Sequence, residues 1–300
     1  MTQKTKITFL GTSGAIPSAK RNSTSILLNY NEENILIDCG EGTQRQIRKA
    51  HLNPCKVNRI LITHWHGDHV LGISGLLQTL ALSGYNKIMH IYGPIGTKKY
   101  IQEMMKTFMF AGEKYEIKVE EVSGNFFETN DFYLKAEKMQ HGIPTNAYSF
   151  VIKDKIRINK KKLAKTKISG PILKDLKKGK DIIYKNKKYK AKDLIYLEKG
   201  KKISFVLDTR MNKMIIPFIK NADLFICEST FSKELKEKAK EYLHMTSEDA
   251  ANVAKKAKVG KLILTHISAR YEKNMKLILD EAKKIFKNSY LAKDLDVLEI

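Results

Sequence analysis

The sequence has few cysteines and no long apolar run. Its three cysteines, Cys39, Cys55 and Cys227, are odd in number and widely spaced, which argues against a disulfide framework or a zinc knuckle and predicts reduced, mostly buried thiols. No apolar run reaches the length of about 18 residues that a transmembrane helix needs, so no membrane partner is expected. The opening residues, MTQKTKITFL, lack the apolar run and cleavage site of a signal peptide. These absences together predict a cytoplasmic protein.

Acidic residues are also scarce relative to basic ones. The 300 residues hold 55 Lys and Arg against 32 Asp and Glu, a net charge of +23. Residues 153–202 alone carry 20 Lys and Arg against five Asp and Glu, although a general lysine bias would spread more evenly. This concentration favours a polyanionic partner, with nucleic acid first. A solvated, lysine-rich insertion without a task is the alternative.

Short apolar runs alternate with amphipathic stretches, a pattern that predicts a mixed α/β protein. Strands are expected at 6–11, 24–29, 34–42, 59–63, 88–94, 115–122, 132–138, 147–153, 203–208, 223–228 and 261–266, and helices at 69–82, 95–109, 212–220, 232–242, 246–258 and 272–286. Residues 154–202 interrupt this rhythm, because they have no strong core-facing run. We therefore expect 1–153 and 203–300 to form one domain, with 154–202 as an inserted basic arm that is flexible at its ends.

Four expected strands end at a residue that is able to bind or orient a metal: Asp38, His64, Asp208 and His266. Sites in α/β proteins collect where strands end, because the sheet holds these positions rigidly. These four side chains are therefore expected to converge although they lie far apart in the sequence.

The stretch Thr63–His69, THWHGDH, adds further ligands. On an extended segment, the alternate residues His64 and His66 point the same way. A turn at Gly67 would bring Asp68 and His69 round to a second centre. Imidazole nitrogen and carboxylate oxygen suit Zn²⁺, with Mn²⁺ as an alternative. The ligands are too many for one tetrahedral ion, and two ions about 3.5 Å apart would use them all.

HWHGDH resembles the H-x-H-x-D-H signature of the metallo-β-lactamase superfamily. More closely, the chain resembles the tRNase Z family of tRNA 3′-end endonucleases over nearly its whole length. The stretches that carry the resemblance are FLGTSGAIPSAKRNS, DCGEGTQRQ, ITHWHGDHVLGISGLL, DTR, EST and LILTHISARY. The resemblance implies an α/β fold of the metallo-β-lactamase type, an αββα sandwich with a protruding basic flexible arm.

The resemblance also implies roles for individual residues. One zinc ion would be bound by His64, His66 and His141, a second by Asp68, His69 and His266, and Asp208 would bridge both; His141 comes from the resemblance alone. Asp38 would orient the His-rich loop.

Catalysis would follow from these ligands. The expected reaction is attack of metal-activated hydroxide on the phosphodiester that joins the 3′ trailer to precursor tRNA, which leaves a 3′-hydroxyl on the tRNA. Asp68 would also act as general base. His244 would protonate the leaving oxygen with Glu228 as its partner, and a structural buried histidine is the alternative.

In the same family the flexible arm clasps tRNA away from the active site. The matching elements here are SGP and LKKGKD, and with the loop PSAKRN they assign tRNA contacts to Gly170, Pro171, Lys177, Lys178, Lys180 and Arg21. Ala19 stands where the family loop has a lysine, which leaves open whether tRNA that already bears CCA is rejected. The resemblance further implies a homodimer in which one subunit's arm serves the other's active site.

Two other functions compete with this prediction. A relative that cuts small phosphodiesters or other RNA would not need a strongly basic arm. A non-catalytic RNA-binding protein would not need seven residues of the type that bind zinc.

Overall fold

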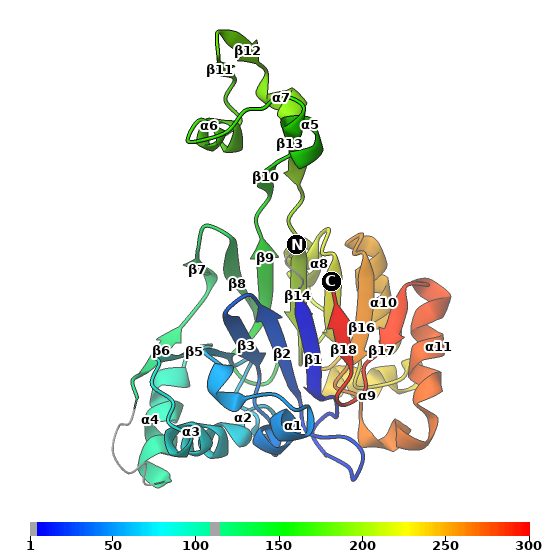
Figure 1. Ribbon diagram of the computed structural model, residues 1–300. Helices are drawn as coiled ribbons and strands as arrows, with labels where there is room; N and C mark the ends of the chain where they lie inside the picture. Colours follow the sequence, from blue (N-terminus) through cyan, green and yellow to red (C-terminus); the bar gives the residue numbers. More distant parts are fainter. Residues whose placement is uncertain (1–4, 109–114) are drawn as a thin grey trace.

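Two seven-stranded sheets, packed face to face and covered by helices on their outer sides, form the body of the protein in the computed structural model, which describes residues 5–108 and 115–300 (Figure 1). This is the expected αββα sandwich. The predicted α/β class and its αββα layering are therefore confirmed.

The first sheet is built mainly from the N-terminal half of the chain. Its spatial order is β18 (Val297–Glu299), β1 (Lys6–Gly11), β2 (Ser25–Tyr30), β3 (Glu33–Ile37), β4 (Arg59–Leu61), β5 (Met89–Gly93) and β6 (Ile117–Glu121). The β3 to β6 pairs are parallel and the others antiparallel. The C-terminal strand β18 thus pairs with the first strand of the chain.

The second sheet is built from strands within residues 124–291. Its order is β17 (Ser289–Leu291), β16 (Lys261–Thr265), β15 (Leu224–Glu228), β14 (Lys202–Val206), β9 (Thr145–Ile152), β8 (Phe132–Met139) and β7 (Gly124–Glu128). Here β14 to β17 are parallel, and β14 pairs antiparallel with β9.

Helices cover the outer face of each sheet (Figure 1). The first sheet carries α1 (Thr43–Lys49), η1 (Pro54–Lys56), α2 (Gly67–Val70), α3 (Gly72–Leu82) and α4 (Thr97–Thr107), and the second carries α8 (Ile215–Ile219), η2 (Lys233–Leu235), α9 (Lys236–Glu241), α10 (Ser247–Lys256), η3 (Ala269–Asn274) and α11 (Met275–Ile285). In the described part of the chain, no helix combines the length and the apolar character needed to cross a membrane.

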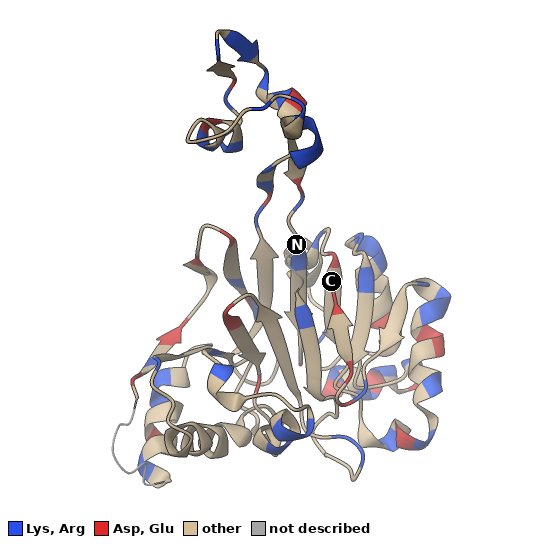
Figure 2. Ribbon diagram, viewed as in Figure 1, with Lys and Arg blue, Asp and Glu red and all other residues tan. Residues whose placement is uncertain are grey.

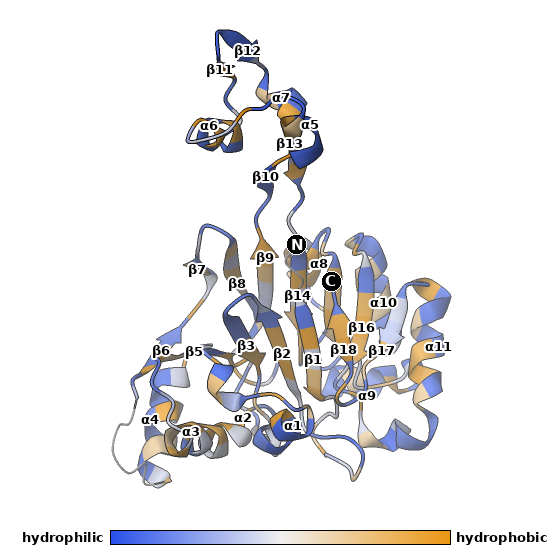
Figure 3. Ribbon diagram, viewed as in Figure 1, coloured by the Kyte–Doolittle hydropathy of each residue, from blue (hydrophilic) through white to orange (hydrophobic). Residues whose placement is uncertain are grey.

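The alternating directions of side chains along the strands explain why each sheet packs on both of its faces. In β15, Leu224 and Ile226 face the core between the sheets, whereas Phe225 and Cys227 face the helices. Successive side chains of a strand point to opposite faces, so a strand that is apolar at every position supplies two cores. Figure 3 shows these apolar strands running through the middle of the body.

The expected elements differ from the observed ones mainly at their ends. The strand expected at 34–42 ends at Ile37, and the helix expected at 69–82 is divided between α2 and α3. The expected helix 95–109 is α4, and residue 109 lies outside the described residues. In the body, the short elements α1, η1, β7, β17 and β18 were not expected. All three cysteines are free thiols, as expected; Cys39 and Cys227 are buried.

Residues 155–198 extend from the loop between β9 and β14 and project beyond the body (Figure 1). This segment, here called the arm, contains β10 (Lys155–Ile158), α5 (Lys160–Ala164), α6 (Leu173–Lys177), β11 (Ile182–Tyr184), β12 (Lys187–Tyr189), α7 (Ala191–Leu194) and β13 (Ile195–Glu198). Figure 2 shows Lys and Arg along most of its length.

The arm has a small core of its own, although its sequence shows no strong core-facing run. Ile168, Leu176, Ile182, Ala191 and Leu194 are buried against one another. These apolar residues are spaced irregularly among lysines, so no single helix or strand period shows them in the sequence. The strand pair β10–β13 then joins this core to the body as a two-stranded stalk.

Candidate active site

The predicted site residues meet at the ends of strands from both sheets. Asp38 follows β3, His64 lies three residues after β4, Asp208 lies two residues after β14, and His266 follows β16 directly. Asp38, Asp208 and His266 have φ angles of 57°, 37° and 53°. Such a backbone costs a non-glycine residue about 1–3 kcal/mol, and it persists where surrounding structure enforces it. The chain thus turns sharply at the positions that bring these side chains together.

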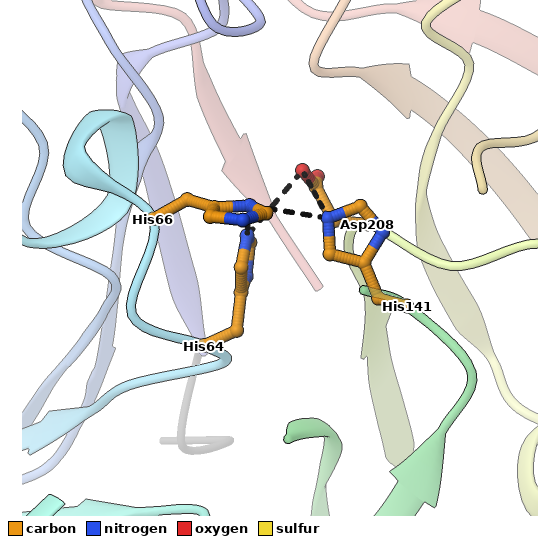
Figure 4. A group of neighbouring side chains, drawn as sticks. All are labelled: His64, His66, His141 and Asp208. Atoms are coloured by element: carbon orange, nitrogen blue, oxygen red, sulfur yellow. Dashed lines mark hydrogen bonds and ion pairs between the residues drawn. The ribbon is translucent and has the colours of Figure 1, made fainter. Parts of the chain in front are cut away.

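One group of donor atoms comes from His64, His66, His141 and Asp208 (Figure 4). His66 Nδ1 lies 3.0 Å from His64 Nε2 and 3.2 Å from His141 Nε2. Asp208 Oδ2 lies 3.6 Å from His64 Nε2 and 4.0 Å from His141 Nε2. Three imidazoles and one carboxylate therefore surround a common point.

A second group comes from Asp68, His69, Asp208 and His266. Asp68 Oδ2 lies 3.2 Å from Nε2 of both His69 and His266. Asp208 Oδ2 lies 3.4 Å from His69 Nε2, and its Oδ1 lies 3.1 Å from His266 Nε2. Asp208 belongs to both groups and so stands between them.

The donors fit a divalent metal. Ligand atoms held at about 2.0–2.1 Å from a tetrahedral ion lie roughly 3.4 Å from one another, close to the separations found here. Among the described residues, Asp208 Oδ1 is one of the few buried oxygens without a hydrogen-bond partner. A buried carboxylate oxygen without a hydrogen bond is costly unless another charge compensates it. A metal ion bound by these residues would supply that charge.

The outer nitrogens of three histidines are held by other residues. His69 Nδ1 lies 2.6 Å from Asp38 Oδ2, His266 Nδ1 lies 2.9 Å from Thr230 Oγ1, and His141 Nδ1 lies 3.1 Å from the carbonyl oxygen of Leu243. A carbonyl oxygen only accepts hydrogen bonds, so His141 carries its proton on Nδ1 and presents Nε2 to the site. Nothing in the sequence distinguishes the contributions of Thr230 or Leu243, because a hydroxyl and a carbonyl are common to many positions.

Asp38 is placed to orient this loop. Besides His69, its carboxylate accepts hydrogen bonds from the backbone N–H and the hydroxyl of Thr63, both at 2.7 Å. Thr63 directly precedes His64. Asp38 therefore fixes both ends of the His-rich segment.

Burial and neighbouring charges set the protonation states. Burial lowers the pKa of His64, which keeps its ring neutral, the state that binds metal. Burial alone would raise the pKa of Asp68, but His69 and His266 hold it well below its usual range. Asp68 therefore stays ionised.

His244 lies beside this cluster and is paired with Glu228. The carboxylate of Glu228 is fully buried, and both of its oxygens lie 3.1 Å from His244 Nδ1. Glu228 also accepts hydrogen bonds from Thr209 N at 2.7 Å and Thr230 Oγ1 at 2.6 Å, which fixes its position. Burial opposes protonation of His244, yet Glu228 and Asp208 raise its pKa to about 9. The two carboxylates therefore favour the protonated form of this ring.

A cleft of about 580 Å³ opens onto the donors. The cleft is lined by Asp68, Asp208, His141 and His244. Aromatic and basic residues line it too. A volume of this order suits one or two nucleotide units rather than a folded domain.

Similar proteins match this chain over nearly its whole length. Ribonuclease Z of Oceanobacillus iheyensis is 39% identical, with 98% of this chain and all of the relative covered. The chain belongs to the ribonuclease Z family. Ribonuclease Z of Archaeoglobus fulgidus is 36% identical over 98% of this chain and 97% of its own length. The resemblance predicted from the motifs, to a tRNase Z-type endoribonuclease, is confirmed.

Solved structures and a family model also match the chain. The crystal structure of human tRNase Z, short form, has a TM-score of 0.73 at 27% identity and covers 98% of both chains. The metallo-β-lactamase fold protein YhfI from Bacillus subtilis, at 19% identity and a TM-score of 0.72, shares the fold and covers 99% of this chain and all of its own. A family model described as anti-Pycsar protein Apyc1 matches residues 5–193.

Arg21, assigned to tRNA binding through the family loop, is buried in the structure. Its guanidinium donates to the carbonyl oxygen and the hydroxyl of Thr12 and to the carbonyl oxygen of Ile267, the residue after His266. Arg21 therefore ties the N-terminal loop to the His266 loop, and little of its surface is exposed. Its burial follows from contacts between distant segments, which a loop motif does not show.

The other residues expected to contact tRNA lie in the arm, away from the donor cluster (Figure 1). Gly170 has a φ of 88° with open space around the position of a Cβ, and Lys177, Lys178 and Lys180 are exposed. Pro171 precedes α6 and is exposed too. These residues are therefore available to a partner, although they make no contact with the site.

Proposed function

We propose that the protein is a dizinc endoribonuclease that removes the 3′ trailer from precursor tRNA. The observation that carries the proposal is the convergence of seven donors in two groups that share Asp208, in a chain of the ribonuclease Z family. His64, His66, His141 and Asp208 would hold one ion, and Asp68, His69, His266 and Asp208 the other. Mn²⁺ is an alternative to Zn²⁺ for the same donors.

Two bound zinc ions lower the pKa of water and neutralise negative charge on a phosphoryl group. The carboxylate of Asp68 stays ionised at the edge of the cleft, where it orients the attacking water and accepts its proton. Attack at phosphorus breaks the bond to the 3′ oxygen of the tRNA. The trailer keeps the phosphate at its 5′ end.

His244 donates the proton that the leaving 3′ oxygen requires. Its protonated ring lines the cleft, and the buried Glu228 holds it in place. The product is a tRNA with a 3′-hydroxyl, and the donor recovers its proton from water.

The arm, within the inserted segment 154–202, binds the tRNA far from the scissile bond. Lys177, Lys178 and Lys180 contact phosphates near Gly170 and Pro171, and the body formed by 1–153 and 203–300 does the chemistry. Lysines that bind phosphate carry no base information, which suits an enzyme with many tRNA substrates. Arg21 contributes indirectly, because it shapes the loop that borders the cleft.

The protein acts as a homodimer in the cytoplasm, with the arm of one subunit clasping the tRNA that the other subunit cleaves. Three free thiols suit a reducing compartment. The distance between the arm and the donor cluster in one chain supports sharing between subunits (Figure 1).

The decisive experiment incubates zinc-loaded protein with a 3′-extended tRNA precursor and maps both new ends. We expect a 3′-hydroxyl on the tRNA and a 5′-phosphate on the trailer, and far less product with Asp68→Ala under the same conditions. Cleavage of small phosphodiesters without cleavage of the precursor would contradict the proposal. A 3′-phosphate product would contradict the mechanism.

A further inference from the structure

One wall of the cleft is aromatic and takes no part in holding the donors. Tyr242 lines the cleft, and 53% of its surface is exposed. Phe231 lies behind it, almost fully buried, with 6.5 Å between ring centroids and 28° between ring planes. A supported, solvent-facing ring in the cleft that holds the metal donors is poorly explained as core packing. It offers a flat apolar surface to a ligand.

Two cations flank these rings. Lys238 Nζ lies 5.9 Å from the ring centroid of Tyr242, and the guanidinium of Arg270 lies 5.1 Å from that of Phe231. Both side chains are exposed and line the cleft. Ser268 accepts a hydrogen bond from Arg270 Nε at 3.0 Å, which restrains the guanidinium. An aromatic surface between two cations is the chemistry that holds a base with its neighbouring phosphates.

Consecutive residues of the backbone connect this aromatic wall to the metal donors and to His244. Tyr242 closes α9, and its N–H donates to the carbonyl oxygen of Lys238 at 3.0 Å. Leu243 follows with a φ of 58°, and its carbonyl orients His141. His244 comes next and contacts Glu228. Three consecutive residues thus supply a ring in the cleft, a contact to a metal-donor histidine and the proton donor.

We propose that Tyr242 is the stacking platform for a nucleobase next to the cleaved phosphodiester, with Lys238 and Arg270 attracting the adjacent phosphates. The inference rests on the proposed function, since it names the part of the RNA that enters the cleft. Stacking on an aromatic ring accepts any base. It therefore positions the scissile bond without restricting the enzyme to one sequence.

The test couples a protein change with a substrate change. In zinc-loaded full-length protein, Tyr242→Ala lowers kcat/KM for precursor RNA about tenfold, and Tyr242→Phe restores most of the loss, because the ring is kept. Precursors with an abasic nucleotide on either side of the scissile bond are then compared. At the stacked position, the abasic substrate costs the wild type a similar factor and costs Tyr242→Ala nothing further.

Tyr290 provides the matched control. It is similarly exposed at 47%, and Lys261 Nζ and Lys283 Nζ lie 5.1 and 5.9 Å from its ring centroid, but it lies on β17 and does not line the cleft. Tyr290→Ala leaves kcat/KM unchanged. The zinc content of Tyr242→Ala equals that of the wild type.

Binding separates failure of this inference from failure of the proposed function. RNA oligonucleotides with 2-aminopurine at successive positions bind to zinc-loaded His244→Asn protein, which keeps all seven donors, and stacking quenches the fluorescence at one position. The quenching disappears in His244→Asn/Tyr242→Ala. Equal quenching in both proteins would contradict stacking on Tyr242, even if the precursor is cleaved. The same holds if, for both abasic substrates, the loss of kcat/KM from Tyr242→Ala multiplies the loss from the missing base. Absence of precursor cleavage with quenching intact would instead remove the proposed function.

Discussion

The body and the arm carry their charges in opposite ways. In the body, the charged residues of the site are buried, paired and fixed: Asp38, Asp208 and Glu228 are almost inaccessible, and each faces a histidine. In the arm, lysines are exposed and outnumber their acidic neighbours (Figure 2). Buried charges act only in one geometry, whereas exposed charges act additively on any nearby phosphate. The body should therefore lose function abruptly on mutation, and the arm gradually.

The largest effect is expected from removing a metal donor. His66→Ala should lose bound zinc and precursor cleavage together, because the remaining donors of the first group no longer enclose an ion. Elemental analysis of the purified variant gives the zinc content. His51→Asn is the control, since His51 lies outside the donor groups and Asn tolerates its φ of 55°. Active wild-type enzyme without a transition metal would contradict the assignment.

Asp68→Ala should separate catalysis from binding. Single-turnover cleavage should fall by roughly 10²–10⁴-fold, the usual contribution of a positioned base. The dissociation constant for precursor tRNA, measured by filter binding, should stay within about twofold, because the arm supplies most phosphate contacts. A loss of affinity as large as the loss of rate would show that tRNA binding by the arm and catalysis at the active site are not separate.

Deleting the arm should weaken tRNA processing without unfolding the body. Lys155 and Glu198 face each other in the β10–β13 ladder, so an Asn-Gly turn can replace residues 156–197. We expect kcat/KM for precursor tRNA to fall about 100-fold and the dependence of binding on salt to flatten, because fewer counterions are released.

Hydrolysis of a chromogenic phosphodiester by the same deletion variant is the control and should survive. Loss of both activities would mean that the arm also shapes the site or the fold. Retention of both activities would show that the arm lysines are ordinary surface residues without a role in tRNA processing.

The buried charge of Arg21 lies outside the donor groups and should affect stability. Arg21→Ala should lower the free energy of unfolding by about 2–3 kcal/mol, because it removes the charged hydrogen bonds to Thr12 and Ile267, whose carbonyl oxygens then keep only a backbone donor each. Lys20→Ala, the exposed neighbour, should change it by less than about 0.5 kcal/mol. Denaturant unfolding of both variants measures the difference. Equal stabilities would restore Arg21 as a candidate RNA contact.

Single arm lysines should have the smallest effects. Lys178→Gln should weaken tRNA binding only a few-fold and reduce the slope of log K against log salt by at most about one. The triple change of Lys177, Lys178 and Lys180 to Gln should give a loss close to the product of three single ones. A single change as damaging as the arm deletion would contradict additive phosphate binding.

The sequence by itself determined the family, the fold class and most of the donor set. HWHGDH places four donors within six residues, and strand ends mark Asp208 and His266, because a strand pattern and its last residue are local features. His141 was reached only through the resemblance, since one histidine in a loop has no local signature.

Only the tertiary structure decided what distant segments do together. It buried Arg21 between two loops, gave the arm a core from scattered apolar residues, and set Leu243 and Thr230 against the outer nitrogens of His141 and His266. It also placed Tyr242 in the cleft beside the donors. These outcomes depend on contacts between residues far apart in the chain, and the period of a helix or strand carries no information about such contacts.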